Sequence, residues 1–219
     1  ISIGALVTHA QAAASPLIRS RLPALADACS QVGSPQIRNA GTVAGNIVSA
    51  QPGADAALAL HVYGTKVQVA GPHGLREMDL AGLYAGLGLC CVDSTTELIT
   101  RIQIPLKDIP THSAFERLSQ RRTLSLPVIN AAVGLKLAPD GRTIAQARVA
   151  LGPVAPKPFR ATAAEELLAG SQYSEDLAGQ AAELASRDSS PRSSQLRGSA
   201  EYRKAMVRVV TQRALVRAM

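Results

Sequence analysis

The chain has 219 residues, 47% of them hydrophobic, so it is long enough to bury one large core or two smaller ones. Aromatic residues make up only 3% and tryptophan is absent, which argues against a base-stacking surface for nucleic acid. The formal net charge is +7, but the lysines and arginines are scattered and form no long basic run. A basic nucleic-acid module, an anionic cofactor, an acidic partner subunit and a solvated basic surface all remain as explanations of this charge.

The three cysteines, Cys29, Cys90 and Cys91, form neither a disulfide framework nor a C-x-x-C metal pattern. We expect no metal site in this chain, and we interpret the adjacent Cys90 and Cys91 as plain thiols rather than a redox pair. This use of cysteine predicts a reduced, cytoplasmic protein. No apolar run approaches the ~20 residues that cross a bilayer and no signal peptide opens the chain, so we expect no membrane span. Because it opens on "ISIGALV", a strand-like stretch, we expect it to be the downstream part of a longer polypeptide.

The first part of the chain is expected to contain one strand followed by helices. The expected elements are a strand at 1–7, a short helix capped by Thr8, a helix at 22–33 that stops at Gly33, and a helix at 54–64 that stops at Gly64. Between the last two helices, "QIRNAGTVAGNIVSAQPGAD" (36–55) is rich in glycine and small polar residues. Such a stretch is a poor core strand and a poor helix, so we expect a long ordered loop.

Downstream, the pattern changes to strands and then back to helices. We expect a hairpin at 65–80, strands at 97–105 and 113–122, a long hairpin at 128–154 that turns on Pro139–Gly141, a helix from Thr162 with Glu165 completing its capping box, a helix from Ser174, a polar linker at 188–199 and a final amphipathic helix. This order predicts α+β organisation in two lobes, 1–110 and 111–219, with the boundary near Lys107–His112.

The chemistry of the chain is expected at the glycine-rich stretch 36–55. Gly41 and Gly45 permit close backbone approach, while Thr42 and Asn46 add a hydroxyl and an amide, so a phosphate or a polar ring edge could be held there. The stretch is neither a G-K-[ST] phosphate loop nor a G-x-G-x-x-G fingerprint, so it can also be only a turn. Asp55 can serve a ligand, the N-terminus of the next helix, or both.

The same twenty residues resemble the signature of the FAD-binding medium subunits of molybdenum hydroxylases, the xanthine dehydrogenase and carbon monoxide dehydrogenase type. That signature reads I-R-N-x-(G/A)-(T/S)-(V/I)-G-G-N-(I/L)-x-x-(A/S)-x-P-x-x-D. The segments "ELITRIQIP", "FERLSQRR", "ARVALGPVAPKPFRATAAEELLAG" and "RGSAEYRKAMVRVVTQRAL" follow in the order of the family, so the resemblance covers essentially the whole chain. It implies the second lobe of a vanillyl-alcohol-oxidase-type FAD-binding domain, followed by a C-terminal lobe of antiparallel sheet and helices.

The resemblance also implies which residues contact FAD. They are Thr42, Val43, Ala44, Gly45, Asn46, Ser49, Asp55, Ile99 and Arg117, with Glu116 replacing Arg117 if the register shifts by one. The sequence departs from the family at Ala44, where relatives have glycine and where a methyl group could crowd the ligand unless φ is negative. It also lacks the family's N-terminal lobe, whose glycine loop cradles the pyrophosphate, so we expect that half of the site in another segment or chain.

The resemblance implies an electron-transfer subunit that carries FAD and no catalytic acid, base or nucleophile. Its expected partners are a large molybdopterin-binding subunit and a small subunit with [2Fe–2S] clusters, from which the flavin passes electrons to NAD⁺, O₂ or another acceptor. Two alternatives stay open. One is an assembly scaffold with an incomplete flavin site, and the other is a nucleic-acid module, which would show strongly salt-dependent binding.

Overall fold

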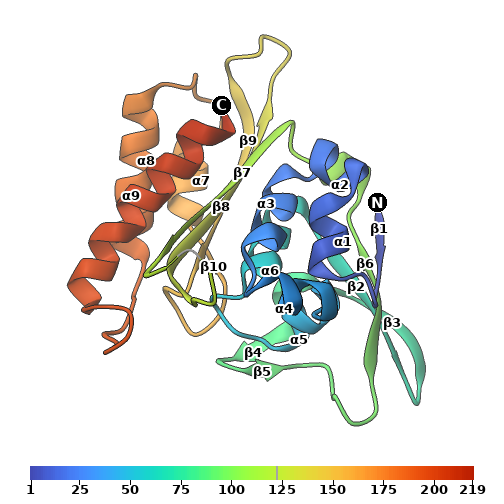
Figure 1. The fold of residues 1–219 in the computed structure, drawn as a ribbon. Helices are drawn as coiled ribbons and strands as arrows, with labels where there is room; N and C mark the ends of the chain where they lie inside the picture. Colours follow the sequence, from blue (N-terminus) through green and yellow to red (C-terminus); the bar gives the residue numbers. More distant parts are fainter. Residues whose placement is uncertain (122) are drawn as a thin grey trace.

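Two antiparallel sheets organise the chain, one in each half (Figure 1). The structure is a computed structural model, and it describes residues 1–121 and 123–219. Within these residues there are two four-stranded sheets, ordered β1-β6-β2-β3 and β10-β9-β8-β7, and a small ribbon of β4 and β5. The prediction of an α+β fold in two lobes is confirmed.

The first lobe surrounds its sheet with short helices. Its elements are β1 (Ser2–Gly4), α1 (His9–Ala14), α2 (Pro16–Arg21), α3 (Pro23–Gln31), α4 (Pro35–Ala40), α5 (Val43–Val48), α6 (Asp55–Leu60), the 3₁₀ turn η1 (His61–Tyr63), β2 (Lys66–Gly71), β3 (Gly74–Asp79), η2 (Leu80–Leu83), β4 (Tyr84–Gly86), β5 (Leu89–Cys90), β6 (Leu98–Gln103) and η3 (Leu106–Asp108). The expected hairpin is confirmed as β2 and β3, paired from Lys66↔Asp79 to Gly71↔Gly74. The Thr8 cap is confirmed as a complete capping box with Gln11.

The glycine-rich stretch is not the long loop that its composition predicts. It folds into two short helices, α4 and α5, which begin after the caps Ser34 and Thr42. The Thr42 hydroxyl accepts a hydrogen bond from the Gly45 amide at 2.9 Å, and Pro35 occupies the first turn of α4, where its missing N–H is not needed. The capping residues therefore decide the local structure, despite the low helix propensity of the segment.

The second lobe contains the longest strands and the longest helices. Its elements are β7 (His112–Ser119), β8 (Pro127–Leu137), β9 (Ile144–Gly152), β10 (Phe159–Arg160), α7 (Thr162–Leu168), α8 (Glu175–Asp188) and α9 (Ala200–Ala218). The strand expected at 113–122 ends at Ser119, and Arg122 lies outside the described residues. The long hairpin is confirmed as β8 and β9.

The sheet of the second lobe is covered on both faces. In Figure 1, α7, α8 and α9 lie on one side of it, and α3 and α6 of the first lobe lie on the other. Along β8, Ala132 joins the core of the first lobe, whereas its neighbours Ala131 and Val133 join the core of the second. Because successive side chains of a strand alternate between faces, this double burial explains why every residue of β8 from Pro127 to Leu135 is buried.

The start of α7 departs from its prediction. The N-cap is Ala161, and Thr162 is already helical, so the expected capping box does not form. Glu165 instead accepts hydrogen bonds from the Val149 amide at 2.7 Å and from the Arg160 guanidinium at 2.6 Å. The Glu165 carboxylate therefore binds a partly buried backbone N–H on β9 and a nearby cation, and not the end of its own helix as the capping-box pattern predicts. The predicted caps at Ser174 and the polar linker before α9 are present.

Two buried histidines make the stability of the chain sensitive to acid. Burial lowers the pKa of His9 and of His61 to about 4, and the ring Nδ1 of His61 lies 2.8 Å from the Ala57 carbonyl oxygen. Below pH 6.5 these histidines bind protons in the unfolded chain but stay neutral in the folded chain. The free energy of unfolding is therefore highest above pH 6.5 and falls as the pH is lowered towards 4. In urea titrations between pH 4.5 and 7.5, His61→Gln should remove part of this slope, up to about 3 kcal/mol. A slope that is the same in His61→Gln and in the wild type would contradict this assignment.

The three thiols are predicted to differ in reactivity. Cys29 is fully buried, and burial raises the pKa of its thiol to about 12, whereas Cys91 is exposed. Because the thiolate is the reactive form, a soluble disulfide reagent should label Cys91 rapidly and Cys29 only after denaturation. Cys91→Ser should remove the fast phase, and Cys29→Ser should leave it intact. Rapid labelling of Cys29 in the folded protein would contradict this assignment.

Candidate functional site

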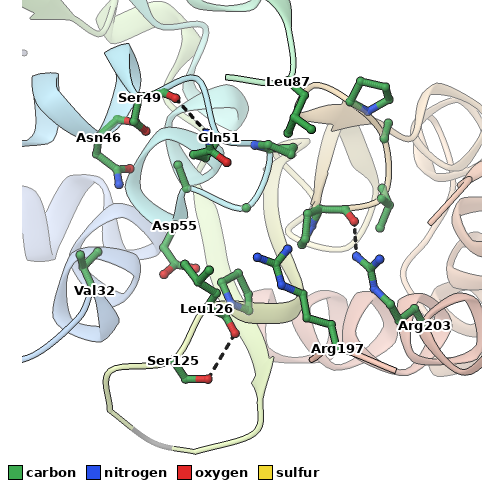
Figure 2. Close-up of a pocket in the computed structure, with 18 of the residues that line it drawn as sticks. Val32, Asn46, Ser49, Gln51, Asp55, Leu87, Ser125, Leu126, Arg197 and Arg203 are labelled. Carbon is green, nitrogen blue, oxygen red and sulfur yellow. Dashed lines mark hydrogen bonds between the residues drawn. The ribbon is translucent and has the colours of Figure 1, made fainter. Parts of the chain in front are cut away.

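A cavity of about 1080 Å³ lies between the two lobes (Figure 2). This volume is just above the range of roughly 300–1,000 Å³ that is typical of small-molecule sites. Its lining comes from both halves of the chain: Val32, Gly33, Ile37, Asn46, Ser49, Gln51–Asp55 and Leu87 from the first lobe, and Leu124–Pro127, Pro153–Pro156, Ser190, Arg192, Arg197 and Arg203 from the second. The segment 36–55 therefore forms one wall of a cavity that either lobe alone would leave open.

The turn between α5 and α6 is held tightly against the second sheet. The Asn46 side-chain oxygen accepts a hydrogen bond from the Ala57 amide at 3.0 Å, which ties the two helices together. A Cβ placed on Gly152 would meet the Pro52 carbonyl oxygen at 2.2 Å, so the backbone of this turn touches the end of β9. The position of the cavity wall thus depends on a contact for which only glycine leaves room.

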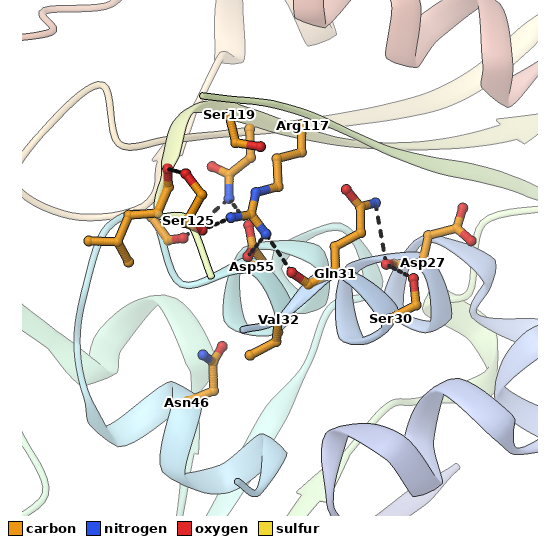
Figure 3. A network of polar contacts seen from close by, with 12 residues as sticks. Asp27, Ser30, Gln31, Val32, Asn46, Asp55, Arg117, Ser119 and Ser125 are labelled. Atoms are coloured by element: carbon orange, nitrogen blue, oxygen red, sulfur yellow. Dashed lines mark hydrogen bonds and ion pairs between the residues drawn. The ribbon is translucent and has the colours of Figure 1, made fainter. Parts of the chain in front are cut away.

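A buried ion pair fixes the floor of the cavity (Figure 3). Arg117 on β7 donates to the Asp55 carboxylate at 2.9 Å, and Asn130 on β8 donates to the other carboxylate oxygen at 2.7 Å. Both charged side chains are less than a tenth exposed. Arg117 also donates to the carbonyl oxygens of Gln31 and Ser125. One guanidinium therefore links α3, α6 and the segment after β7.

The ionisation of Asp55 is governed by its burial. Burial raises the pKa of this carboxyl to about 6, although Arg117 and the Asn130 hydrogen bond both favour the charged form. Asp55 also stands in the first turn of α6, where a negative charge is favourable. The structural role expected for Asp55 is therefore present, and its carboxylate also lines the cavity.

The residues that the sequence nominates for FAD lie in three places. Asn46, Ser49 and Asp55 line the cavity. Thr42, Val43, Ala44 and Gly45 form the start of α5 beside it, where Val43 and Ala44 are buried. Arg117 lies directly behind Asp55, and Ile99 on β6 is only 4% exposed and packs in the core of the first lobe. Their contacts with FAD stay a prediction.

Ala44, the departure from the family signature, causes no backbone strain. Its φ is negative, since the only described residues other than glycine with positive φ are Ala50 and Leu124. Its methyl group is 6% exposed and packs in the core of the first lobe. A methyl group that is directed into the core leaves the approach to the cavity free.

Sequence reasoning did not find the cavity wall that the second lobe supplies. Arg192 and Arg197 belong to a stretch predicted as a polar linker, and Arg203 belongs to the predicted final helix. The guanidinium of Arg203 fixes this helix, since it donates to the carbonyl oxygens of Val128, Pro153 and Arg192. The high density of arginines in this stretch was the one available signal, and nothing local relates it to a turn about 140 residues earlier in the sequence.

The lining suits a dinucleotide with an apolar ring system. Ser49, Gln51 and the Asn46 amide offer hydrogen-bonding groups, while Leu87, Leu126 and Val154 offer apolar surface.

In the described part of the chain, no three His, Cys, Asp or Glu side chains gather as a metal site. No described helix is long and apolar enough to cross a bilayer.

Comparison with known proteins assigns both lobes. Residues 1–107 match the family model described as the FAD binding domain in molybdopterin dehydrogenase, and residues 114–218 match the CO dehydrogenase flavoprotein C-terminal domain. The carbon monoxide dehydrogenase medium chain of Hydrogenophaga pseudoflava is 32% identical over 98% of this chain and 73% of the relative. The nicotine 6-hydroxylase medium subunit of Paenarthrobacter nicotinovorans is 32% identical over 100% of this chain and 75% of the relative.

Solved structures agree in fold. Carbon monoxide dehydrogenase from Hydrogenophaga pseudoflava superposes with a TM-score of 0.90 at 30% identity, covering 99% of this chain and 74% of that chain. Quinoline 2-oxidoreductase from Pseudomonas putida 86 superposes with a TM-score of 0.88 at 29% identity, covering 99% and 74% of the two chains. These matches extend over both lobes and the cavity between them. The chain therefore belongs to the family of FAD-binding medium subunits of the molybdenum hydroxylases.

Proposed function

We propose that the chain holds FAD at the cavity between its lobes and passes electrons from [2Fe–2S] clusters in a partner subunit to NAD⁺, O₂ or another acceptor. The observation that carries this proposal is that the family signature, residues 36–55, forms a wall of a cavity of about 1080 Å³. The proposed complex also contains a large molybdopterin-binding subunit, in which substrate is oxidised. We place it in the cytoplasm, in keeping with the three free cysteines.

The chain itself would bind and orient the cofactor, while the flavin supplies the redox chemistry when bound. We assign hydrogen bonds with the cofactor to Ser49, Gln51 and the Asn46 amide, which line the cavity. Leu87 and Leu126 would exclude water from the same space. The Asp55–Arg117 pair would act one layer behind, by holding the turn after α5 against the second sheet. No residue of the chain acts as an acid, base or nucleophile in this proposal.

The N-terminal glycine loop that the family resemblance implies would supply the other half of the flavin site. The 219 residues contain no A-G-G-x-[ST] sequence. We propose that such a lobe faces the start of α5, where Thr42 and Gly45 lie. FAD binding should therefore be measured on the complete polypeptide together with its partner subunits.

A variant that fills the cavity tests the proposal. Ser49 is exposed and lines the cavity, so Ser49→Trp should occupy ligand space without disturbing the core. FAD affinity, measured from flavin absorbance of the purified complex and by reconstitution, should fall at least about tenfold, or about 1.4 kcal/mol. Ser20→Trp, at an exposed position of α2 that does not line the cavity, is the matched control and should retain FAD.

Two outcomes would overturn the proposal. If Ser49→Trp and Ser20→Trp both keep full flavin content, FAD lies elsewhere on the subunit. If the wild-type complex carries all its molybdenum and iron but no flavin, the chain is an assembly scaffold.

A further inference from the structure

Three arginines form one wall of the cavity. Arg192 and Arg197 lie on the segment between α8 and α9, and Arg203 lies in the second turn of α9. Figure 2 shows the guanidinium of Arg197 directed into the cavity, towards the turn that carries Gln51. Arg203 is only 2% exposed, whereas Arg192 is exposed and Arg197 is half-buried. The positive charge of this wall therefore extends from the buried interior at Arg203 to the solvent-exposed edge of the cavity at Arg192.

No carboxylate of the described residues neutralises this wall. None of the ion pairs found between described residues includes Arg192, Arg197 or Arg203. The guanidinium of Arg203 is met by three carbonyl oxygens, those of Val128, Pro153 and Arg192. The carboxylate that lines the cavity belongs to Asp55, and Arg117 already balances its charge. The cavity thus has a net positive charge on its second-lobe side.

The three charges act on one another. Burial and then the neighbouring Arg192 lower the pKa of Arg197. Burial, followed by Arg197 and Arg192, lowers the pKa of Arg203. Like charges that are brought together without a counter-charge carry a cost, which a bound anion would relieve.

Arg197 lies in a short turn that is held by several hydrogen bonds. The Arg197 amide donates to the Ser194 carbonyl oxygen at 3.2 Å, and Ser194 and Gly198 form a bridge that closes a short turn. Gly198 has φ +93°, and a Cβ there would meet the Tyr202 ring at 2.8 Å. Ser193 accepts from the Ala200 amide at 3.0 Å, which joins this turn to the start of α9. Arg197 therefore stands on an ordered turn and not on a free linker.

We infer that Arg197, with Arg192 and Arg203 beside it, binds the diphosphate group of a nucleotide in this cavity. A guanidinium fork matches two phosphate oxygens at once, and several guanidinium groups suit the multiple charges of a diphosphate. This inference rests on the proposed function, because it takes the cavity to be a dinucleotide site. The same chemistry has two sources, the diphosphate of FAD and that of a soluble nicotinamide dinucleotide acceptor.

Calorimetric titration with inorganic pyrophosphate tests the inference. The purified complex is titrated with and without its flavin, as wild type and as Arg197→Gln. We expect pyrophosphate to bind the flavin-free wild type and to bind Arg197→Gln at least about tenfold more weakly, as hydrogen bonds to a charged group are lost. Arg208→Gln removes the same charge from the exposed face of α9 and should bind like wild type. Equal affinity of the wild type and Arg197→Gln, or no binding to either, would overturn the inference.

The flavin-loaded protein separates the two sources. If pyrophosphate still binds when FAD is present, the site serves a soluble dinucleotide, and NADH should compete for it. If FAD abolishes pyrophosphate binding and Arg197→Gln also lowers flavin content, the arginines hold the diphosphate of the cofactor. A wild-type complex that never carries flavin contradicts the proposed function instead, and flavin absorbance reports this independently of the titration.

Discussion

Arg117→Ala is expected to destabilise the protein by about 3–5 kcal/mol, because it leaves the buried Asp55 carboxylate without its cation. The same change removes the hydrogen bonds to the carbonyl oxygens of Gln31 and Ser125, so α3, α6 and the segment after β7 lose a shared anchor. Urea unfolding at pH 8 measures the free energy of unfolding. Arg208→Ala, which breaks an exposed pair at 3.8 Å, is the matched control and should cost less than about 1 kcal/mol.

The destabilisation caused by Arg117→Ala should depend on pH. The folded pKa of Asp55 is about 6, above the ordinary aspartate value of 3.8, so ionisation of this carboxyl opposes folding as pH rises between these values. Without Arg117 the folded pKa rises further and the cost of ionisation grows. The difference in stability between Arg117→Ala and wild type should therefore be smaller at pH 5 than at pH 8. A difference that does not change with pH would show that lost packing, and not the unpaired carboxylate, causes the destabilisation.

A double variant separates the charge from the space it fills. In Asp55→Leu combined with Arg117→Met, neither charge of this buried pair remains, so the protein should be more stable than Arg117→Ala alone. FAD content distinguishes the two roles of the pair. If the pair acts by positioning the turn after α5, the double variant should keep its fold and still lose part of its flavin affinity. Flavin affinity equal to that of wild type would limit the pair to a stabilising role.

Gly152→Ala is the second change with a large expected effect. The new methyl group would lie 2.2 Å from the Pro52 carbonyl oxygen and 2.7 Å from the Asn130 side-chain oxygen. A backbone oxygen cannot rotate away, so the turn at 51–54 must shift from the sheet, at a cost of about 3 kcal/mol or more. Thermal or urea unfolding should show this loss, and FAD affinity should fall with it. Gly82→Ala, whose methyl group meets no atom within 4 Å, should leave both quantities unchanged.

The two readouts in Gly152→Ala also test whether the cavity wall and the sheet are coupled. If stability falls but flavin affinity does not, the turn is displaced without effect on the site. If neither stability nor flavin affinity changes, Pro52 does not lie as close to β9 as described here.

Much of the fold follows from local patterns in the sequence. The caps at Thr8, Ser174 and the stop at Gly64 depend on hydrogen bonds within four residues and on one positive φ, so their signals survive in any globular context. The hairpins likewise depend on alternation and turn residues that lie side by side in sequence. The family signature could also be recognised in the sequence, because its twenty residues are contiguous.

Local sequence patterns were therefore enough to predict the caps, the hairpins, the α+β order and the family. Which groups face the cavity could be learned only from the folded chain. Arg117 binds Asp55, 62 positions earlier in the sequence, and Glu165 binds the Val149 amide instead of capping its own helix. Arg197 lines the same cavity as the turn at 51–54. These choices depend on burial, since a buried donor or charge takes the nearest partner in space. Local propensity carries no information on which partner that is.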